Sequence, residues 1–153
     1  MQTGSICNIE VKSTLTIKEL KTSVEKARSI ENLKFIKDES IPKNLSRPFS
    51  ALIALESKLT GKNYNEVERY IKTYPEAKNL PEIGLICVVG KGYWYFNGSH
   101  WISWNADKSC AEVTGFIAGV LNTASRLASY KYKIPFGYYF IEEFVNRSFV
   151  FKD

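Results

Sequence analysis

The sequence has few of the residues that build metal centres and disulfide frameworks. Its 153 residues include one histidine and three cysteines. Cys7, Cys87 and Cys110 match no zinc-ligand spacing, and an odd number of cysteines argues against a disulfide framework. The single histidine, His100, argues against a zinc site. These absences exclude the disulfide-rich and zinc-binding classes and favour a reducing, cytoplasmic location.

Long apolar runs are also lacking. The longest, Ile83 to Val89, is far shorter than the roughly 18 residues that a membrane span needs, and the polar start, MQTGS, has no signal-peptide layout. Charge is moderate, with 21 basic and 16 acidic side chains and a formal net charge of +5. Such a charge permits nucleic acid or an acidic protein as a partner without requiring either. We expect one domain, residues 1–153, and no membrane partner.

Hydrophobic periodicity predicts alternating strands and helices. Capping boxes, S/T-x-x-E, begin helices at Thr16 and Ser109, and Asn97-Gly98 between two apolar runs predicts a hairpin. The expected order is strand 6–13, helix 16–27, strand 49–57, helix 63–74, strand 83–90, hairpin 93–104 and helix 109–127. This order predicts an α/β fold in which helices flank a mixed β-sheet.

The first predicted strand, residues 6–13, alternates between apolar and polar side chains. We expect the apolar set to be buried and the polar set to face solvent: Cys7, Ile9 and Val11 against Asn8, Glu10 and Lys12. Glu10 and Lys12 then point the same way. Metal-dependent phosphodiesterases use such a pair, because a carboxylate holds Mg²⁺ and a lysine stabilises the transition state. The Val11 carbonyl is a further candidate metal ligand.

The E-x-K spacing alone favours an ordinary strand with a surface ion pair, which contributes little stability. The same spacing recurs at Glu19-Leu20-Lys21, where the periodicity predicts a helix. Spacing therefore leaves both interpretations open, and the surrounding sequence has to decide between them.

That surrounding sequence, IEVKSTLTIKELKTSVEKARSI, resembles the third-strand motif and following helix of the PD-(D/E)XK nuclease superfamily. More narrowly, it resembles a bacterial and phage domain family whose members read IEVKSTL before a Lys/Glu-rich helix. The resemblance continues through FSALIALESKL, PEIGLICVVGKGYWYF and AEVTGFIAGVLNTASRL, so it covers residues 6–127 and leaves an aromatic tail at 130–153. It implies a restriction-endonuclease-like core, with Glu10 as a metal-binding acid and Lys12 as the catalytic lysine. Lys18 and Lys21 lie where such folds often contact phosphates.

Half of the superfamily motif has no counterpart upstream of the E-x-K strand. In the superfamily a preceding hairpin carries the first acid, whereas the nine residues before Glu10 contain none. We therefore expect a truncated core with an incomplete Mg²⁺ site and a first strand at the sheet edge. Three explanations stay open: a fragment of a longer nuclease, an acid supplied by Glu56 or by a dimer partner, or a fold reused for binding.

Aromatic side chains supply the other candidate surface, on the predicted hairpin. By alternation about half of them can face the core, and the rest would be exposed unless a helix or a partner covers them. Core and partner-binding roles therefore stay alternatives for Trp94, Trp101 and Trp104.

Two functions follow from these observations. The first is a nuclease-like protein that cleaves DNA or RNA with Mg²⁺ once another chain or segment completes its site. The alternative is a non-enzymatic protein-binding module, such as a phage-encoded, anti-CRISPR-like inhibitor of a host defence nuclease, or a subunit of a defence complex. The partner is nucleic acid in the first case and a host or phage protein in the second. A homodimer through the free edge of the first strand is a third alternative.

Overall fold

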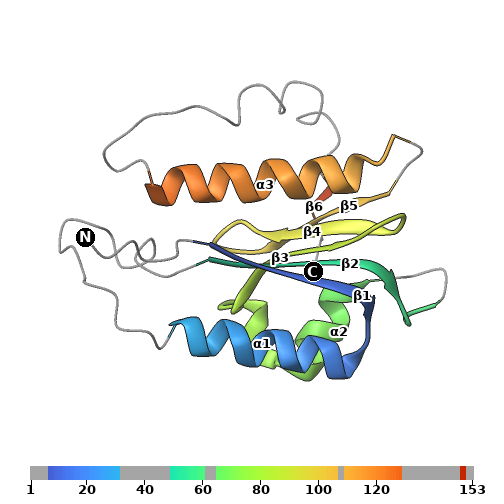
Figure 1. Cartoon of the computed structure of the whole chain (residues 1–153), viewed down its shortest axis with the longest axis horizontal. Coiled ribbons are helices and arrows are strands. Elements are labelled where there is room, and N and C mark those ends of the chain that lie inside the picture. Colours follow the sequence, from blue (N-terminus) through green and yellow to red (C-terminus); the bar gives the residue numbers. More distant parts are fainter. Residues whose placement is uncertain (1–6, 32–48, 61–64, 107–108, 129–148, 151–153) are drawn as a thin grey trace.

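Six strands form one mixed sheet whose spatial order follows the chain order (Figure 1). The computed structural model describes residues 7–31, 49–60, 65–106, 109–128 and 149–150. The first three strands are parallel: β1 (Cys7–Leu15), β2 (Phe49–Ser57) and β3 (Ile83–Val88). The next three are antiparallel: β4 (Gly92–Phe96), β5 (Trp101–Asn105) and β6 (Phe149–Val150). The predicted α/β architecture is confirmed.

Helices cover both faces of this sheet (Figure 1). One face carries α1 (Ile17–Glu31), α2 (Glu66–Thr73) and the short 3₁₀ helix η2 (Pro75–Lys78), and the other carries α3 (Ala111–Ala128). The predicted helices are therefore present. Of the aromatic tail, the structure describes only the two residues of β6. Within the described part of the chain, no helix has the length and apolar character needed to cross a membrane.

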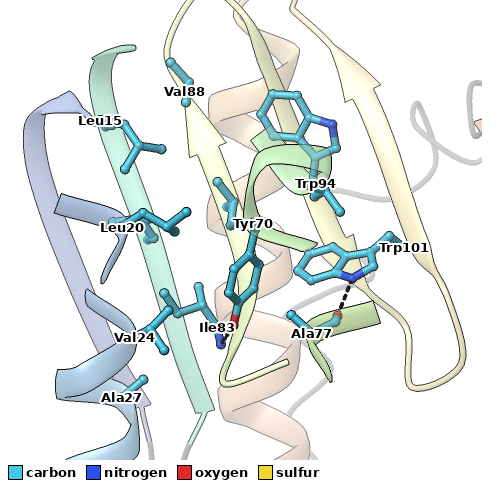
Figure 2. Close-up of a cluster of buried hydrophobic side chains, with 14 residues drawn as sticks. Leu15, Leu20, Val24, Ala27, Tyr70, Ala77, Ile83, Val88, Trp94 and Trp101 are labelled. Atoms are coloured by element: carbon cyan, nitrogen blue, oxygen red, sulfur yellow. Dashed lines mark hydrogen bonds between the residues drawn. The ribbon is translucent and has the colours of Figure 1, made fainter. Parts of the chain in front are cut away.

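Two hydrophobic clusters hold the layers together. The larger lies between the sheet and α1, α2 and η2 (Figure 2), and its members include Leu20, Val24, Leu52, Tyr70, Ile86 and Trp94. The smaller lies under α3 and is formed by Ala51, Leu85, Cys87, Tyr93 and Phe116. Because both faces of β3 and of the first part of β2 are covered, these strands read as almost continuous apolar runs in the sequence.

The aromatic hairpin belongs mainly to the core. Trp94 and Trp101 are 2% and 6% exposed, and the Trp101 Nε1 donates to the Ala77 carbonyl at 2.9 Å. Trp104 is half-buried and stacks on Tyr93, with ring centroids 5.4 Å apart. The structure thus places Trp94 and Trp101 in the interior, where they have no surface to offer a partner, and leaves only Trp104 partly accessible.

The hairpin turn is longer than the Asn-Gly pair alone. Phe96 pairs with Trp101, so four residues connect the strands. The Asn97 side-chain oxygen accepts from the backbone amides of Ser99 and His100, both at 3.0 Å, and Gly98 has a φ of +103°. The sequence signal for a hairpin is confirmed, with a side-chain-stabilised turn in place of a two-residue one.

The two faces of β1 are the reverse of the prediction. Ile9 and Val11 are 47% and 67% exposed, whereas Glu10 and Lys12 lie under α1 with 17% and 13% of their side chains exposed. The helix that directly follows β1 covers the face of Glu10 and Lys12, while α3 packs mainly over β3 and β4. Alternation shows which residues share a face, but the position of the helices decides which face is covered.

Candidate functional site

The predicted acid–lysine pair is present on β1 and is part of a larger ion-pair network. The Lys12 Nζ lies 3.0 Å from the Glu10 Oε1. From α1, the Lys26 Nζ donates to the same Glu10 oxygen at 2.7 Å, and the Glu19 Oε2 lies 2.5 Å from the Lys12 Nζ. Glu19 and Lys26 are seven residues apart, about two helical turns, so they share one face of α1. The four side chains alternate in sign and tie α1 to β1.

The start of α1 explains why Glu19 points toward β1. The Glu19 amide donates to the Thr16 hydroxyl at 3.1 Å, which is the first half of the predicted capping box. The Glu19 carboxylate, which would complete the box by reaching back to the Thr16 amide, is instead engaged by Lys12. The helix cap therefore also positions a carboxylate beside the candidate catalytic lysine.

The network fixes the charges of both site residues. Burial raises the pKa of Glu10, but hydrogen bonds from Lys26 and Lys12 outweigh it, so that the pKa lies below its usual value. The hydrogen bond to Glu19, aided by that to Glu10, raises the pKa of Lys12 above its usual value against the effect of burial. At neutral pH Glu10 is therefore an anion and Lys12 a cation, which can donate hydrogen bonds but cannot accept a proton.

The residues around Glu10 do not fit Mg²⁺ by themselves. Mg²⁺ requires near-octahedral oxygen coordination, yet no three His, Cys, Asp or Glu side chains converge anywhere in the described ranges. The Lys12 ammonium sits between the carboxylates of Glu10 and Glu19. A role for the Val11 carbonyl as a metal ligand stays a prediction. Lys12 and Lys26 both contact the Glu10 Oε1.

Glu56 does not supply the missing acid within this chain. Glu10 pairs with Leu52 on β2, while Glu56 pairs with Thr14, four residues farther along. At about 3.3 Å per residue, that offset is roughly 13 Å. Two carboxylates at this separation cannot share one metal ion, so an acid that completes the site has to come from another segment or another chain.

The lysines predicted to bind phosphate lie apart from this network. Lys18 and Lys21 are exposed on α1, and the helical lysine that contacts Glu10 is Lys26. Lys26 lies two helical turns after Glu19, so the sequence already places both on one face of the helix. That spacing points to a contact with Glu10 only once α1 is known to cover Glu10. A phosphate-binding role for Lys18 and Lys21 stays a prediction.

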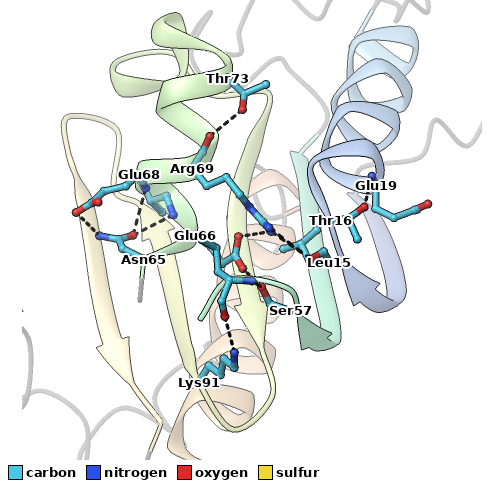
Figure 3. A network of polar contacts seen from close by, with 12 residues as sticks. Leu15, Thr16, Glu19, Ser57, Asn65, Glu66, Glu68, Arg69, Thr73 and Lys91 are labelled. Carbon is cyan, nitrogen blue, oxygen red and sulfur yellow. Dashed lines mark hydrogen bonds and ion pairs between the residues drawn. The ribbon is translucent and has the colours of Figure 1, made fainter. Parts of the chain in front are cut away.

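A second polar cluster, which the sequence did not reveal, joins α2 to the ends of β1 and β2 (Figure 3). Glu66 is only 1% exposed and is paired with Arg69 one helical turn later. The Ser57 hydroxyl donates to the Glu66 Oε1, and the Arg69 guanidinium donates to the Leu15 carbonyl at 3.4 Å. Because Leu15 and Ser57 end their strands, the cluster ties α2 to the ends of β1 and β2.

The chain resembles proteins of known structure rather than families known from sequence. No protein-family model matches it, and no curated protein does. The solved structure of NucC from E. coli MS115-1, in its apo form, matches with a TM-score of 0.54 and 18% identity, over 76% of this chain and 55% of that chain. NucC from P. aeruginosa ATCC27853, in its cAAA-bound form, matches with a TM-score of 0.53 and 17% identity, over 76% and 52%.

The chain has a restriction-endonuclease-like fold. It shares the mixed sheet and flanking helices of the NucC structures, and it spans about half the length of the NucC chains that it matches. At this level of identity the likeness concerns the fold, and function has to be argued from the site. Membership of the narrower IEVKSTL family stays a prediction.

Proposed function

We propose that this chain is a nuclease-like protein that acts by binding another protein along β1 and does not cleave nucleic acid on its own. The observation that carries this proposal is the exposed apolar face of β1. Ile9 and Val11 are about half and two-thirds exposed, next to a carboxylate whose oxygen already accepts from two lysines.

The outer edge of β1 is suited to strand addition. β1 has nine residues, and no described residue pairs with it on the side away from β2. An edge strand of this length presents unpaired backbone donors and acceptors, which a second strand can satisfy. Leu55 on β2 is 60% exposed and extends the apolar surface beside Ile9 and Val11. Binding along β1 would therefore combine backbone hydrogen bonds with apolar burial.

The biological settings that fit this proposal are the two that the sequence suggested. A phage-encoded inhibitor of a host defence nuclease and a subunit of a defence complex both act through contacts with protein. Both settings employ a nuclease-like fold for binding, which is consistent with a fold that hosts several functions.

The proposal predicts that the purified chain shows no metal-dependent cleavage. Incubated with Mg²⁺ or Mn²⁺ and single-stranded DNA, duplex DNA or RNA, it should produce fragments no faster than buffer does, because Glu10 lacks a second carboxylate. Glu10→Gln and the surface control Glu25→Gln should behave like the unmodified chain. Gel-resolved cleavage that Glu10→Gln abolishes and Glu25→Gln preserves would contradict the proposal.

A second candidate is a nuclease whose site another chain or segment completes. The specific observation in its favour is that Glu10 and Lys12 lie together on the edge strand, so that anything added beside β1 brings its own side chains next to Glu10. In that assembly Glu10 would be one of the acids that hold Mg²⁺, Lys12 would stabilise negative charge, and Lys18 and Lys21 would be candidates for phosphate contacts.

A further inference from the structure

We propose that the protein that binds along β1 is a second copy of this chain, paired antiparallel about a two-fold axis that passes beside Val11. This inference rests on the proposed function and names its partner. The order of charged and apolar side chains on β1 is complementary to itself when the strand is reversed.

The charged face of β1 selects one register. With the axis beside Val11, Glu10 lies directly opposite Lys12 of the second copy, and Lys12 lies opposite Glu10 of the second copy. Side chains that face each other across antiparallel strands have Cβ atoms about 5 Å apart, where opposite charges attract. The two pairs give four charges of alternating sign across the axis, and Glu10 and Lys12 are already held on this face by α1.

The neighbouring registers are disfavoured by the same residues. Moving the axis to Glu10 places the two Glu10 carboxylates opposite each other, and moving it to Lys12 places the two ammonium groups opposite each other. Like charges directly across a ladder are destabilising. A two-fold axis that passed between Val11 and either neighbour would place Val11 opposite Glu10 or Lys12 of the second copy. Side chains alternate along each strand, so these opposed residues would point to different faces of the sheet.

The apolar face gains burial in the selected register. Val11, the most exposed large apolar side chain of β1, lies opposite Val11 of the second copy, and Ile9 lies opposite Ser13 of the second copy. β-branched side chains pack well across strands. The pairing thus buries part of the exposed surface of these two apolar residues.

The helices leave the edge of β1 open for this pairing. α1 packs over the Glu10 face of β1 and reaches inward to β3, on the side of β1 away from its outer edge. α3 packs mainly on β3 and β4, two strands away from the edge. A two-fold axis perpendicular to the sheet therefore joins two six-stranded sheets into one continuous sheet, with equivalent helices on the same face.

Sedimentation equilibrium tests the existence of the dimer. The unmodified chain should sediment with twice the 17.5 kDa mass of one chain. Val11→Lys, which sets two ammonium groups against each other at the axis, should sediment as a monomer. Leu80→Lys changes a similarly exposed apolar residue in the segment before β3, outside β1 and β2, and should remain a dimer. A monomer of the unmodified chain would overturn the inference and leave binding of a different protein along β1 to be judged separately.

Disulfide trapping tests the register. In a Cys7→Ser, Cys110→Ser background, Val11→Cys should form a crosslinked dimer on oxidation with diamide, because opposed Cα atoms lie about 5 Å apart, within disulfide range. Ile9→Cys and Ser13→Cys should each crosslink poorly alone, since their symmetry mates are roughly 13 Å apart. Mixing these two variants should restore the crosslink. Equal crosslinking of Val11→Cys and Ser13→Cys would overturn the proposed register.

Discussion

Replacing Arg69 with methionine is expected to lower the free energy of unfolding by about 3–5 kcal/mol, because it removes the guanidinium that pairs with the buried Glu66 carboxylate. The Glu66 side chain is 1% exposed, and the Arg69 side chain is 10% exposed. The change also removes the guanidinium donors from the Leu15 carbonyl at the end of β1. Urea denaturation followed by circular dichroism measures the loss.

Two further variants separate buried charge from lost packing. The double variant Glu66→Leu, Arg69→Met removes both charges and should recover most of the loss, since apolar replacement of a whole buried pair is often neutral. Arg28→Met removes an arginine that is 43% exposed and pairs with Glu76 and Glu82, and it should cost no more than about 1 kcal/mol. Equal decreases in the free energy of unfolding for Arg28→Met and Arg69→Met would contradict the prediction, because they would show that the burial of Glu66 does not add to the cost of removing its partner.

Gly119→Ala is expected to destabilise the protein by about 1–3 kcal/mol, although alanine in a helix normally gains about 1 kcal/mol over glycine. A Cβ at position 119 would lie 2.6 Å from the Leu85 Cδ2 and in still closer conflict with the Tyr93 hydroxyl. The Tyr93 ring cannot yield easily, because it is buried and stacks on Trp104. α3 would have to move away from β3 and β4.

Gly84→Ala is the matched control for this prediction. A Cβ at position 84 would meet Phe49 at 3.6 Å, which is an ordinary contact. Thermal unfolding should show a lower midpoint for Gly119→Ala and little change for Gly84→Ala. A higher midpoint for Gly119→Ala would mean that helix propensity outweighs the close approach of α3 to the sheet.

The elements of this fold could be predicted because each has a strong local signal. The alternation of β1, the capping box at Thr16, the apolar run of β3 and the Asn97-Gly98 turn all depend on neighbours in sequence. The covered face of β1 could not be predicted in this way. It depends on where α1 and α3 lie, and α3 begins about a hundred residues later in the chain.

The candidate site could be predicted only in part, for a related reason. Glu10 and Lys12 were found because a two-residue spacing on a strand fixes their common direction. Lys26 was missed, since a lysine on an amphipathic helix ordinarily faces solvent, and Glu66 and Arg69 were missed because a helical i, i+3 ion pair ordinarily lies at the surface. The contacts of Lys26, Glu66 and Arg69 are made with strand residues that are not their neighbours in sequence.

The two lysines beside Glu10, Lys12 and Lys26, bear on whether this face of β1 can bind a metal ion. Both lysines contact the Glu10 Oε1, and under the proposed function Glu10 lacks the second carboxylate that a metal site needs. An added carboxylate should therefore change the behaviour of this face. Asp at position 8, two residues before Glu10 on the same face of β1, would supply it, and Asn8→Asp serves as the positive control for metal binding.

Isothermal titration calorimetry with Mn²⁺ is the measurement that tests this claim most directly. The unmodified chain should give no saturable heat, while Asn8→Asp should show binding that an additional Glu10→Gln change removes. Saturable, one-site Mn²⁺ binding by the unmodified chain that Glu10→Gln abolishes would contradict the claim that Glu10 lacks its metal partners.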